Sequence, residues 1–371
     1  MNSVTILNSS VGNYIKSNGN KYSYFAGNNY LGLANHPVIK KASIRSIKMY
    51  GNNFSASRRT TGTADIHLEL EKQLAAFMKK QDAVIFASGY MGNGILLEIL
   101  KNRYSAVFID ELAHPSITGS IPRGIENIQY FNHCDASHLE NLLGHHKGLN
   151  PLVITDGIFA LTGEIAPLDK IYPLIEKHNA ILVVDDAHST GILGENGRGT
   201  AEHFNLDWAE NIYTTGTMSK ALGGYGGFIS GTNELTNLIR EKSATYQAST
   251  SLPPSIIATG IASLKIIQKN PGLRVSLLES AGELRKEIIG LGFQTTTDNT
   301  PIIPIMLTEL SKAKDLSLFL ENNGIIAPFM NYPVKLKGYM IRITVSASHT
   351  VDQIETLLKM LKKWRDKNGT N

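Results

Sequence analysis

Lys220 is the residue whose surroundings could best support covalent chemistry. It lies in the segment TGTMSKALGG (Thr215 to Gly224), between hydroxyl-bearing residues and a glycine run. Glycine lets a ligand approach the backbone closely, and a lysine in a dry site has a lowered pKa, so its amine can form a Schiff base with an aldehyde. Taken alone, the segment fits a solvated loop lysine or a bare phosphate clamp better.

Two carboxylates and an imidazole form a second group. Asp185 and Asp186 directly follow the apolar run Ile181 to Val184, and His188 lies two residues beyond them. A buried carboxylate is costly without a cationic partner, so one of the two acids is expected to face a cation. The segment leaves a helix-capping role open as the alternative.

Two further segments end an apolar run near polar residues. The run AVIFA (Ala83 to Ala87) leads into Gly89 and Tyr90 at the start of a helix, where backbone N–H groups can bind a phosphate. The run AVFID precedes His114, and a lone histidine at such a place is more often structural than catalytic. Neither segment is specific by itself.

The elements that must position these residues alternate between strand and helix. Short apolar, β-branched runs predict strands, whereas Leu168 to His178 has its apolar residues on one helical face. The predicted strands are Ala83 to Ala87, Ala106 to Ile109, Leu152 to Thr155, Ile181 to Val184, Ile212 to Thr214 and Gly227 to Ser230. This α/β alternation predicts a mainly parallel central sheet flanked by helices, with ligands outside the carboxyl ends of the strands.

The order of predicted strands and helices changes near residue 270. A long helix, a strand, a helix, a strand and a final helix predict a smaller C-terminal α/β domain over residues 270–371. Residues 51–269 are expected to form the large domain. Residues 1–50 show little periodicity and are expected to form an N-terminal arm.

Composition excludes several classes of function. Lys plus Arg exceed Asp plus Glu by only four, 36 against 32, so nothing indicates nucleic acid or a membrane surface as partner. The single cysteine, Cys134, and the absence of a secretory signal predict a cytoplasmic protein, with the role of Cys134 open. No metal site is expected, because the adjacent His145 and His146 have no spaced partner.

All of these segments together resemble the α-oxoamine synthase family of fold-type I pyridoxal-phosphate enzymes. The similarity covers nearly the whole chain. The motifs that carry it are NNYLGLANHP (Asn28 to Pro37), SRRTTGT (Ser57 to Thr63), DDAHSTGILGENGRGT (Asp185 to Thr200), TGTMSKALGG, STSLPP (Ser249 to Pro254) and IRITVSASHT (Ile341 to Thr350). The resemblance implies a fold-type I transferase that binds pyridoxal 5'-phosphate (PLP).

The resemblance also implies roles in the cofactor site. Lys220 is similar to the lysine that forms the Schiff base and takes the α-proton, and Asp185 to the acid that keeps the pyridine nitrogen protonated. His188 matches the residue beside the phenolic oxygen, and His114 the imidazole stacked on the ring. The residues expected to bind the phosphate are Gly89, Tyr90 and Thr217.

Two further sets of residues are carried over from the family. Ser249 or Thr250 is expected to reach the phosphate of the neighbouring subunit, which implies a homodimer with shared active sites. Asn28 and Arg342 resemble the groups that hold the amino acid's carboxylate, a task suited to arginine's planar fork. Thr344 is expected to line the same pocket.

The implied reaction joins an amino acid to an acyl thioester, carried by coenzyme A or a carrier protein, with loss of carbon dioxide. The residues of these motifs resemble more closely the enzymes that use L-alanine and a pimeloyl thioester, in a step of biotin biosynthesis, than those that use glycine and an acetyl thioester. A catalytically silent protein of the same fold is a rival, and a nucleotide-dependent oxidoreductase is another. The oxidoreductase would require a GxGxxG element at its first strand, and this chain has none there.

The match departs from the family at two places. Ala160 stands where the family usually has a serine, and Thr162 could supply the missing hydroxyl. The helical segment that often precedes the NYLGL motif is nearly absent. Any acyl-pocket or dimer contacts that this segment makes in the family must therefore come from other parts of the chain.

Overall fold

The computed structural model describes residues 5–146, 148–330 and 338–369. The chain divides into two compact units. The larger unit contains residues 37–159 and 165–270, and the smaller unit contains residues 1–36, 160–164 and 271–371.

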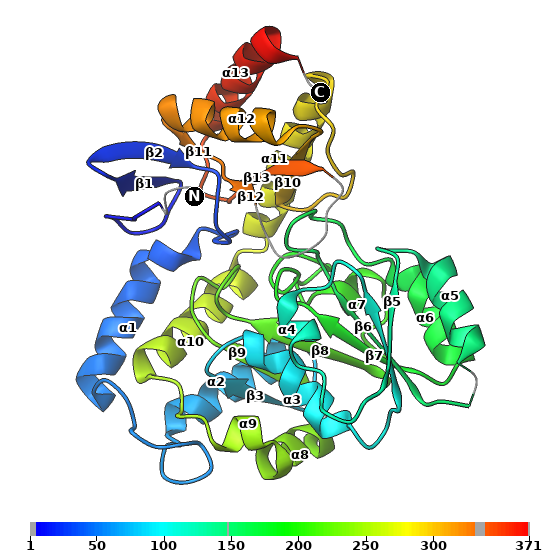
Figure 1. The fold of residues 1–371 in the computed structure, drawn as a ribbon. Helices are drawn as coiled ribbons and strands as arrows, with labels where there is room; N and C mark the ends of the chain where they lie inside the picture. The colour runs from blue at the N-terminus through cyan, green and yellow to red at the C-terminus, as the bar shows by residue number, and fades with distance from the viewer. Residues whose placement is uncertain (1–4, 147, 331–337, 370–371) are drawn as a thin grey trace. The chain divides into compact units, whose positions relative to one another are not determined.

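A seven-stranded sheet in the order β3-β9-β8-β7-β6-β4-β5 forms the centre of the larger unit (Figure 1). The antiparallel pairs are β3 with β9 and β9 with β8, so β9 alone runs against the other six strands. The strands are β3 (Asp82–Phe86), β4 (Ala106–Asp110), β5 (Asn127–Phe131), β6 (Pro151–Asp156), β7 (Ile181–Asp185), β8 (Ile212–Thr217) and β9 (Gly227–Gly231). The predicted mainly parallel sheet is confirmed.

Both faces of this sheet are buried. Alternate residues of β4, Val107 and Ile109, pack in one apolar cluster with α3 (Tyr90–Leu100) and α8 (Asn233–Lys242). Their neighbours Ala106 and Phe108 pack in a second cluster with α5 (Ala136–His145) and α6 (Leu168–Lys177). Because successive strand residues point to opposite faces, a sheet covered on both sides requires the continuous apolar runs seen in the sequence.

The remaining helices of the larger unit are α1 (Pro37–Tyr50), α2 (Asp65–Phe77), α4 (Pro115–Thr118), α7 (Thr200–His203), α9 (Ala244–Gln247) and α10 (Pro254–Lys269). Strand β5 and helix α1 are among the elements that were not predicted. Strand β5 lies at the sheet edge and alternates polar residues with apolar ones, so it lacks a continuous apolar run. Helix α1 packs against α10 but carries few buried residues, which hides its period.

The smaller unit has two three-stranded sheets, β1-β2-β11 and β10-β13-β12. Its strands are β1 (Tyr14–Ser17), β2 (Asn20–Tyr24), β10 (Ile302–Leu307), β11 (Ile325–Ile326), β12 (Phe329–Met330) and β13 (Tyr339–Thr344). Its helices are the 3₁₀ turn η1 (Leu33–Asn35), α11 (Gly272–Gly290), α12 (Leu310–Asn322) and α13 (Val351–Asn368).

The expected N-terminal arm over residues 1–50 stays a prediction, and the structure shows where its segments pair and pack. Strand β2 pairs in parallel with β11, with Ser23 opposite Ile325, so residues 1–36 belong to the unit that holds the C-terminal segment. Helix α1 belongs to the larger unit instead. A pairing between residues some 300 positions apart leaves no local signal in the sequence.

In the part of the chain that the structure describes, no helix combines the length and the apolar character that a membrane crossing would need.

Candidate active site

Asp185 ends β7 at the carboxyl edge of the sheet, and it is 5% exposed. Its Oδ2 accepts a hydrogen bond from Asn93 Nδ2 at 2.6 Å and lies 3.5 Å from the Ser116 hydroxyl. Its Oδ1 accepts from the backbone N–H of Ala187 at 3.0 Å. The described hydrogen-bond donors of this carboxylate are therefore neutral, which leaves it suited to a protonated ring nitrogen.

His114 is the N-cap of α4, where its Nδ1 accepts from the backbone N–H of Ser116 at 3.1 Å. Its own backbone N–H donates to Asp156 Oδ2 at 2.8 Å. Burial lowers the pKa of His114, and the nearby Lys220 charge lowers it further while Asp185 opposes the change. His114 is thus favoured in its neutral form, and the charges of Asp185 and Lys220 both act on it.

Lys220 lies in the turn that follows β8, as expected. The Thr217 hydroxyl at the end of β8 donates to the Gly226 carbonyl at 2.8 Å and accepts from the backbone N–H of Ser219 at 3.2 Å. The Lys220 carbonyl accepts from the backbone N–H of Gly223 at 2.9 Å. These bonds order the turn on both sides of the lysine.

The N-terminus of α3 fits a phosphate. Gly89 is the N-cap residue and supplies no side-chain cap, while the backbone N–H groups of Tyr90 and Met91 donate to the Ser88 hydroxyl at 3.3 Å and the Ser88 carbonyl at 3.0 Å. The helix start therefore offers an anion its partial positive charge. A Cβ on Gly89 would lie 2.8 Å from Cβ and Oγ1 of Thr217, and a Cβ on Gly227 would lie 2.8 Å from Gly89 Cα. Only glycines leave this cradle open beside the Thr217 hydroxyl. Tyr90 opens the helix, and its ring meets that of His114 edge-on, with centroids 6.2 Å apart.

Asp186 and His188 follow Asp185 in the same turn and are both buried. Asp186 Oδ1 accepts from the Thr200 hydroxyl at 2.6 Å, and both its oxygens accept from the Thr200 backbone N–H. Burial is the main cause that raises the pKa of Asp186 to about 7. Asp186 therefore ties the turn to the start of α7, which is the capping role left open by the sequence, while Asp185 faces the site.

Ser249 and Thr250 lie near the loop that contains Ser57. Thr250 forms an isolated antiparallel bridge with Ser57, and the Ser249 hydroxyl donates to the Thr245 carbonyl at 2.7 Å. Their expected contact with a partner's phosphate stays a prediction.

The three residues predicted to hold the amino acid converge within the smaller unit. Arg342 donates from Nε to the Ala160 carbonyl at 2.6 Å, from Nη1 to Thr344 Oγ1 at 3.0 Å and from Nη2 to Asn28 Oδ1 at 2.9 Å. The guanidinium is thereby held in one orientation by three partners. Ala160 takes part through its carbonyl, so the missing serine hydroxyl leaves this anchor in place. Thr162, the proposed substitute, accepts from the Glu164 backbone N–H at 3.4 Å.

Sequence reasoning missed Asn93, Ser116 and Asp156. Asn93 is fully buried in helix α3, whose other buried residues are glycine, isoleucine and leucine, and a buried amide needs a partner. That contrast was a usable signal. Asp156 ends β6 as Asp185 ends β7, and burial together with the Asp185 charge raises its pKa well above the ordinary value.

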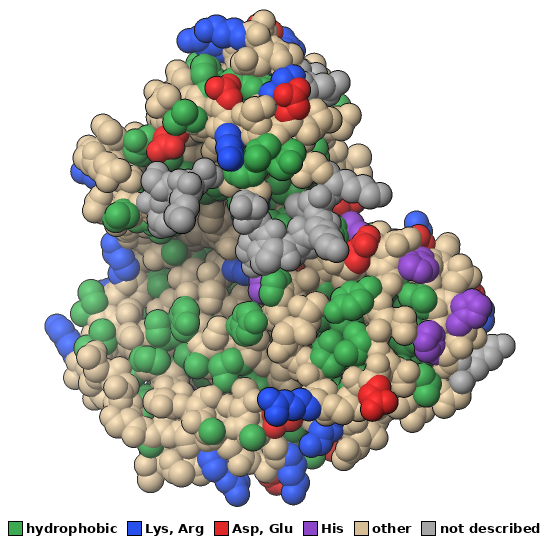
Figure 2. Space-filling view, in the orientation of Figure 1, with side chains coloured by type: hydrophobic (Ala, Val, Ile, Leu, Met, Phe, Trp, Pro, Cys, Tyr) green, Lys and Arg blue, Asp and Glu red, His purple; other side chains and the backbone are tan. Residues whose placement is uncertain are grey.

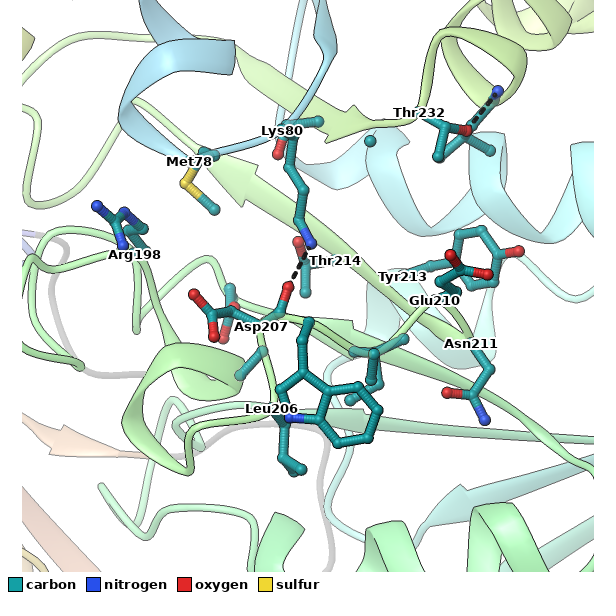
Figure 3. A pocket seen from close by; sticks show the side chains of 18 of the residues that line it. Met78, Lys80, Arg198, Leu206, Asp207, Glu210, Asn211, Tyr213, Thr214 and Thr232 are labelled. Carbon is teal, nitrogen blue, oxygen red and sulfur yellow. Dashed lines mark hydrogen bonds between the residues drawn. The ribbon is translucent and has the colours of Figure 1, made fainter.

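A separate cavity of about 690 Å³ lies within the larger unit (Figure 3). It is lined by the start of β8, the end of β9 and the loop around Trp208, and Lys80 donates across it to the Asp207 carbonyl at 2.9 Å. Its charged lining residues are of both signs, and it contains neither Lys220 nor His114. It is distinct from the candidate site.

The sheet, with a lysine and a buried aspartate at its carboxyl edge, defines a fold-type I transferase. The chain belongs to the family described as aminotransferase class I and II, which matches residues 21–361. It is similar to the 8-amino-7-oxononanoate synthase 1 of Bacillus subtilis strain 168, at 36% identity over 96% of this chain and 91% of that one.

Two solved structures share the fold and the length of the chain. A serine palmitoyltransferase from S. paucimobilis with a bound PLP–myriocin aldimine has a TM-score of 0.93 at 28% identity, covering 98% of this chain and 92% of that one. The 8-amino-7-oxononanoate synthase of Francisella tularensis has a TM-score of 0.79 at 26% identity, covering 92% and 96%.

Proposed function

We propose that this chain is a PLP-dependent acyltransferase that condenses L-alanine with a pimeloyl thioester to give 8-amino-7-oxononanoate, coenzyme A and carbon dioxide in biotin biosynthesis. The observation that carries the proposal is similarity to 8-amino-7-oxononanoate synthases along nearly the whole chain, at 36% identity. A second observation supports the proposal: the residues of the candidate site fit the cofactor. Retention of Lys220, Asp185, His188 and Arg342 together argues against a catalytically silent protein.

When bound, PLP supplies an electron sink that stabilises negative charge on the α-carbon of an amino acid. Lys220 would hold the cofactor covalently, and its amine, when free, would take the α-proton of the amino acid. Asp185 keeps the ring nitrogen protonated, because its buried carboxylate has neutral protein donors and gains a cationic partner there. His114 would hold the ring of the cofactor, and His188 would hold its phenolic oxygen.

The phosphate is bound by the start of α3 and by the Thr217 hydroxyl. The helix N-terminus carries partial positive charge, and the glycine cradle lets an anion reach the backbone N–H groups. Ser249 or Thr250 adds a hydroxyl from the partner subunit.

Arg342 binds the carboxylate of the amino acid, with Asn28 and Thr344 beside it. A planar guanidinium already fixed by three hydrogen bonds loses little entropy when it receives an anion. Burial is the main cause that raises the pKa of the neighbouring Tyr30 to about 12, so its hydroxyl stays neutral and does not repel a carboxylate.

A serine palmitoyltransferase activity is the second candidate, because such an enzyme has the higher TM-score, 0.93 against 0.79. Sequence identity favours the first candidate, at 36% against 28%. Condensation of glycine with an acetyl thioester is a further alternative within the same chemistry.

We further propose a cytoplasmic homodimer with shared active sites. Helix α1 exposes Val38, Ile44, Ile47 and Met49 by 41 to 70% each, and exposed apolar side chains of this kind are often covered by a partner subunit. Figure 2 shows further hydrophobic side chains at the surface of the larger unit. A molecular mass near that of a single chain in light scattering would contradict the dimer.

The experiment that tests the function compares amino acid and thioester pairs by release of coenzyme A. L-alanine, glycine and L-serine are each offered with pimeloyl, acetyl and palmitoyl thioesters. The proposal predicts the highest kcat/KM for L-alanine with pimeloyl-coenzyme A. The highest value for L-serine with palmitoyl-coenzyme A, or for glycine with acetyl-coenzyme A, would replace it by the corresponding alternative.

A further inference from the structure

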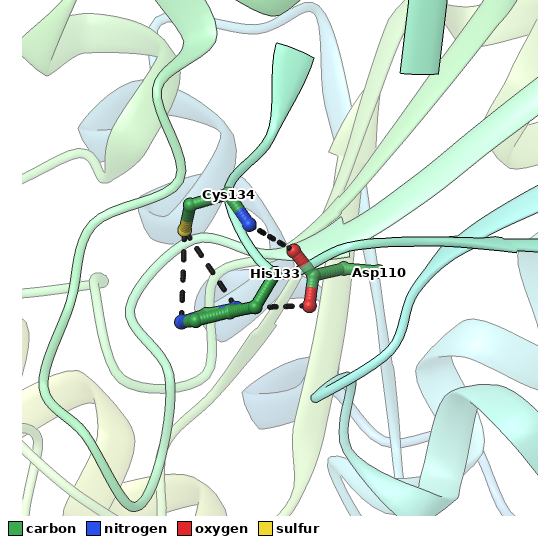
Figure 4. A group of neighbouring side chains, drawn as sticks. All are labelled: Asp110, His133 and Cys134. Carbon is green, nitrogen blue, oxygen red and sulfur yellow. Dashed lines mark hydrogen bonds and ion pairs between the residues drawn. The ribbon is translucent and has the colours of Figure 1, made fainter. Parts of the chain in front are cut away.

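Asp110, His133 and Cys134 form a cluster outside the candidate active site (Figure 4). Asp110 ends β4, and the other two residues follow β5, the neighbouring parallel strand. The cluster therefore joins the carboxyl ends of two adjacent strands.

The three side chains offer one donor atom each, a carboxylate oxygen, an imidazole nitrogen and a sulfur, and these atoms lie within 4.8 Å of one another. His133 Nδ1 is 2.9 Å from Asp110 Oδ1, and Cys134 Sγ is 3.7 Å from both ring nitrogens of His133. Donors bound to one zinc ion at about 2.0 to 2.3 Å in tetrahedral geometry stand roughly 3.3 to 3.7 Å apart. The separations from His133 Nδ1, 2.9 Å to Asp110 and 3.7 Å to Cys134, lie near this range.

We propose that Asp110, His133 and Cys134 bind a divalent cation of the zinc class, with water completing the coordination. A set that mixes sulfur, nitrogen and oxygen suits zinc better than magnesium or calcium, which prefer oxygen alone. Binding releases the thiol proton and any proton on the imidazole, and both leave to solvent. No metal site was expected from the sequence, where only His145 and His146 were considered as ligands.

Charge and backbone order support this site. Asp110 is 1% exposed, and its carboxylate also accepts from the backbone N–H groups of Leu112 and Cys134, each at 2.9 Å. These bonds fix the carboxylate before any ion arrives. A buried carboxylate is costly without a positive charge nearby, and a divalent cation would provide one that does not depend on protonation of His133.

The backbone of Cys134 supplies a variant that separates binding from folding. Its φ is +54°, in the left-handed region where asparagine is favoured over other non-glycine residues. Cys134→Asn removes the chain's only thiol and should fold at least as well as the parent protein. His145→Ala, an exposed histidine on α5, is the matched control.

The test titrates cobalt(II) into untagged, PLP-loaded protein and records difference absorption spectra. X-ray absorption spectroscopy of the zinc-loaded protein is the second measurement. We expect one equivalent per chain, a thiolate-to-cobalt charge-transfer band and one sulfur at about 2.3 Å from zinc. The band should disappear in Cys134→Asn and persist in His145→Ala. In His133→Gln the affinity for cobalt should fall at least tenfold. Absence of the band in the parent protein, or equal cation binding by Cys134→Asn with an unchanged melting temperature, would overturn the proposal.

Discussion

Asn93 Nδ2 donates to Asp185 Oδ2 at 2.6 Å, and both side chains are buried. The bond joins α3, whose N-terminus is the proposed phosphate site, to the end of β7, which carries Asp185. The same amide also donates to the Ser116 hydroxyl at 3.0 Å. Asn93 thus orients Asp185 from the helix that is proposed to bind the phosphate.

Removing this amide should weaken cofactor binding. A hydrogen bond to a charged group contributes about 1.5 to 3 kcal/mol, so Asn93→Ala is expected to raise the Kd for PLP by about 10- to 100-fold. Fluorescence titration of the apoenzyme measures this, with the exposed Asn237→Ala on α8 as control. An unchanged Kd in Asn93→Ala would show that Asp185 needs no such support.

The glycine cradle predicts a steric effect. In Gly89→Ala the new methyl group meets Thr217 at 2.8 Å, closer than real Cβ contacts allow, so the cradle must open or the helix start must shift. PLP affinity should fall by at least tenfold. Gly144→Ala is the matched control because its Cβ meets nothing within 4 Å, and it should stabilise helix α5 by about 0.5 to 1 kcal/mol. Equal PLP affinities in the two variants would rule out the cradle.

The fixed guanidinium of Arg342 predicts a change in kinetics on substitution by lysine. Lys cannot reproduce three hydrogen bonds in one plane, so Arg342→Lys should lower kcat/KM for L-alanine by about 10- to 100-fold. The KM for the thioester should change little. A similar loss for both substrates would indicate general misfolding of the unit.

Asp186 predicts a dependence of stability on pH. Its pKa of about 7 in the folded protein exceeds the ordinary 3.8, so between these values the folded chain holds a proton that the unfolded chain has released. The free energy of unfolding contributed by this group therefore falls as pH rises from about 4 to 7, by about 4 kcal/mol at most.

The variant Asp186→Asn lacks this titration. The difference in free energy of unfolding between the variant and the parent protein should grow in favour of the variant as pH rises over that range. Urea unfolding at several pH values measures it. A difference that stays constant with pH would show that Asp186 is ionised throughout.

The ends of the buried strands were predictable where an apolar run stops at a polar residue, as at Val184 and Asp185. Apolar residues repeat every two residues in a half-buried strand and every 3.6 in a helix, and such a repeat can be seen in a short segment of the sequence. The partners of Asp185 were not predictable in the same way, since Asn93 and Ser116 come from other elements. The pairing of β2 with β11 likewise depends on tertiary packing that no local pattern records.

The roles of Lys220 and Arg342 came from the family resemblance and not from their surroundings in the sequence. The structure adds the geometry that the resemblance lacked, above all the three hydrogen bonds that fix Arg342. It also shows that Ala160 contacts the guanidinium through its carbonyl and not through its side chain.

The covalent role of Lys220 is the central claim, and borohydride reduction of the PLP-loaded enzyme followed by peptide mass mapping tests it most directly. We predict one phosphopyridoxyl group per chain, on the peptide containing Lys220, and none in Lys220→Ala even where that variant still binds PLP through the α3 cradle. Labelling of a different lysine, or equal labelling of Lys220→Ala, would contradict the account.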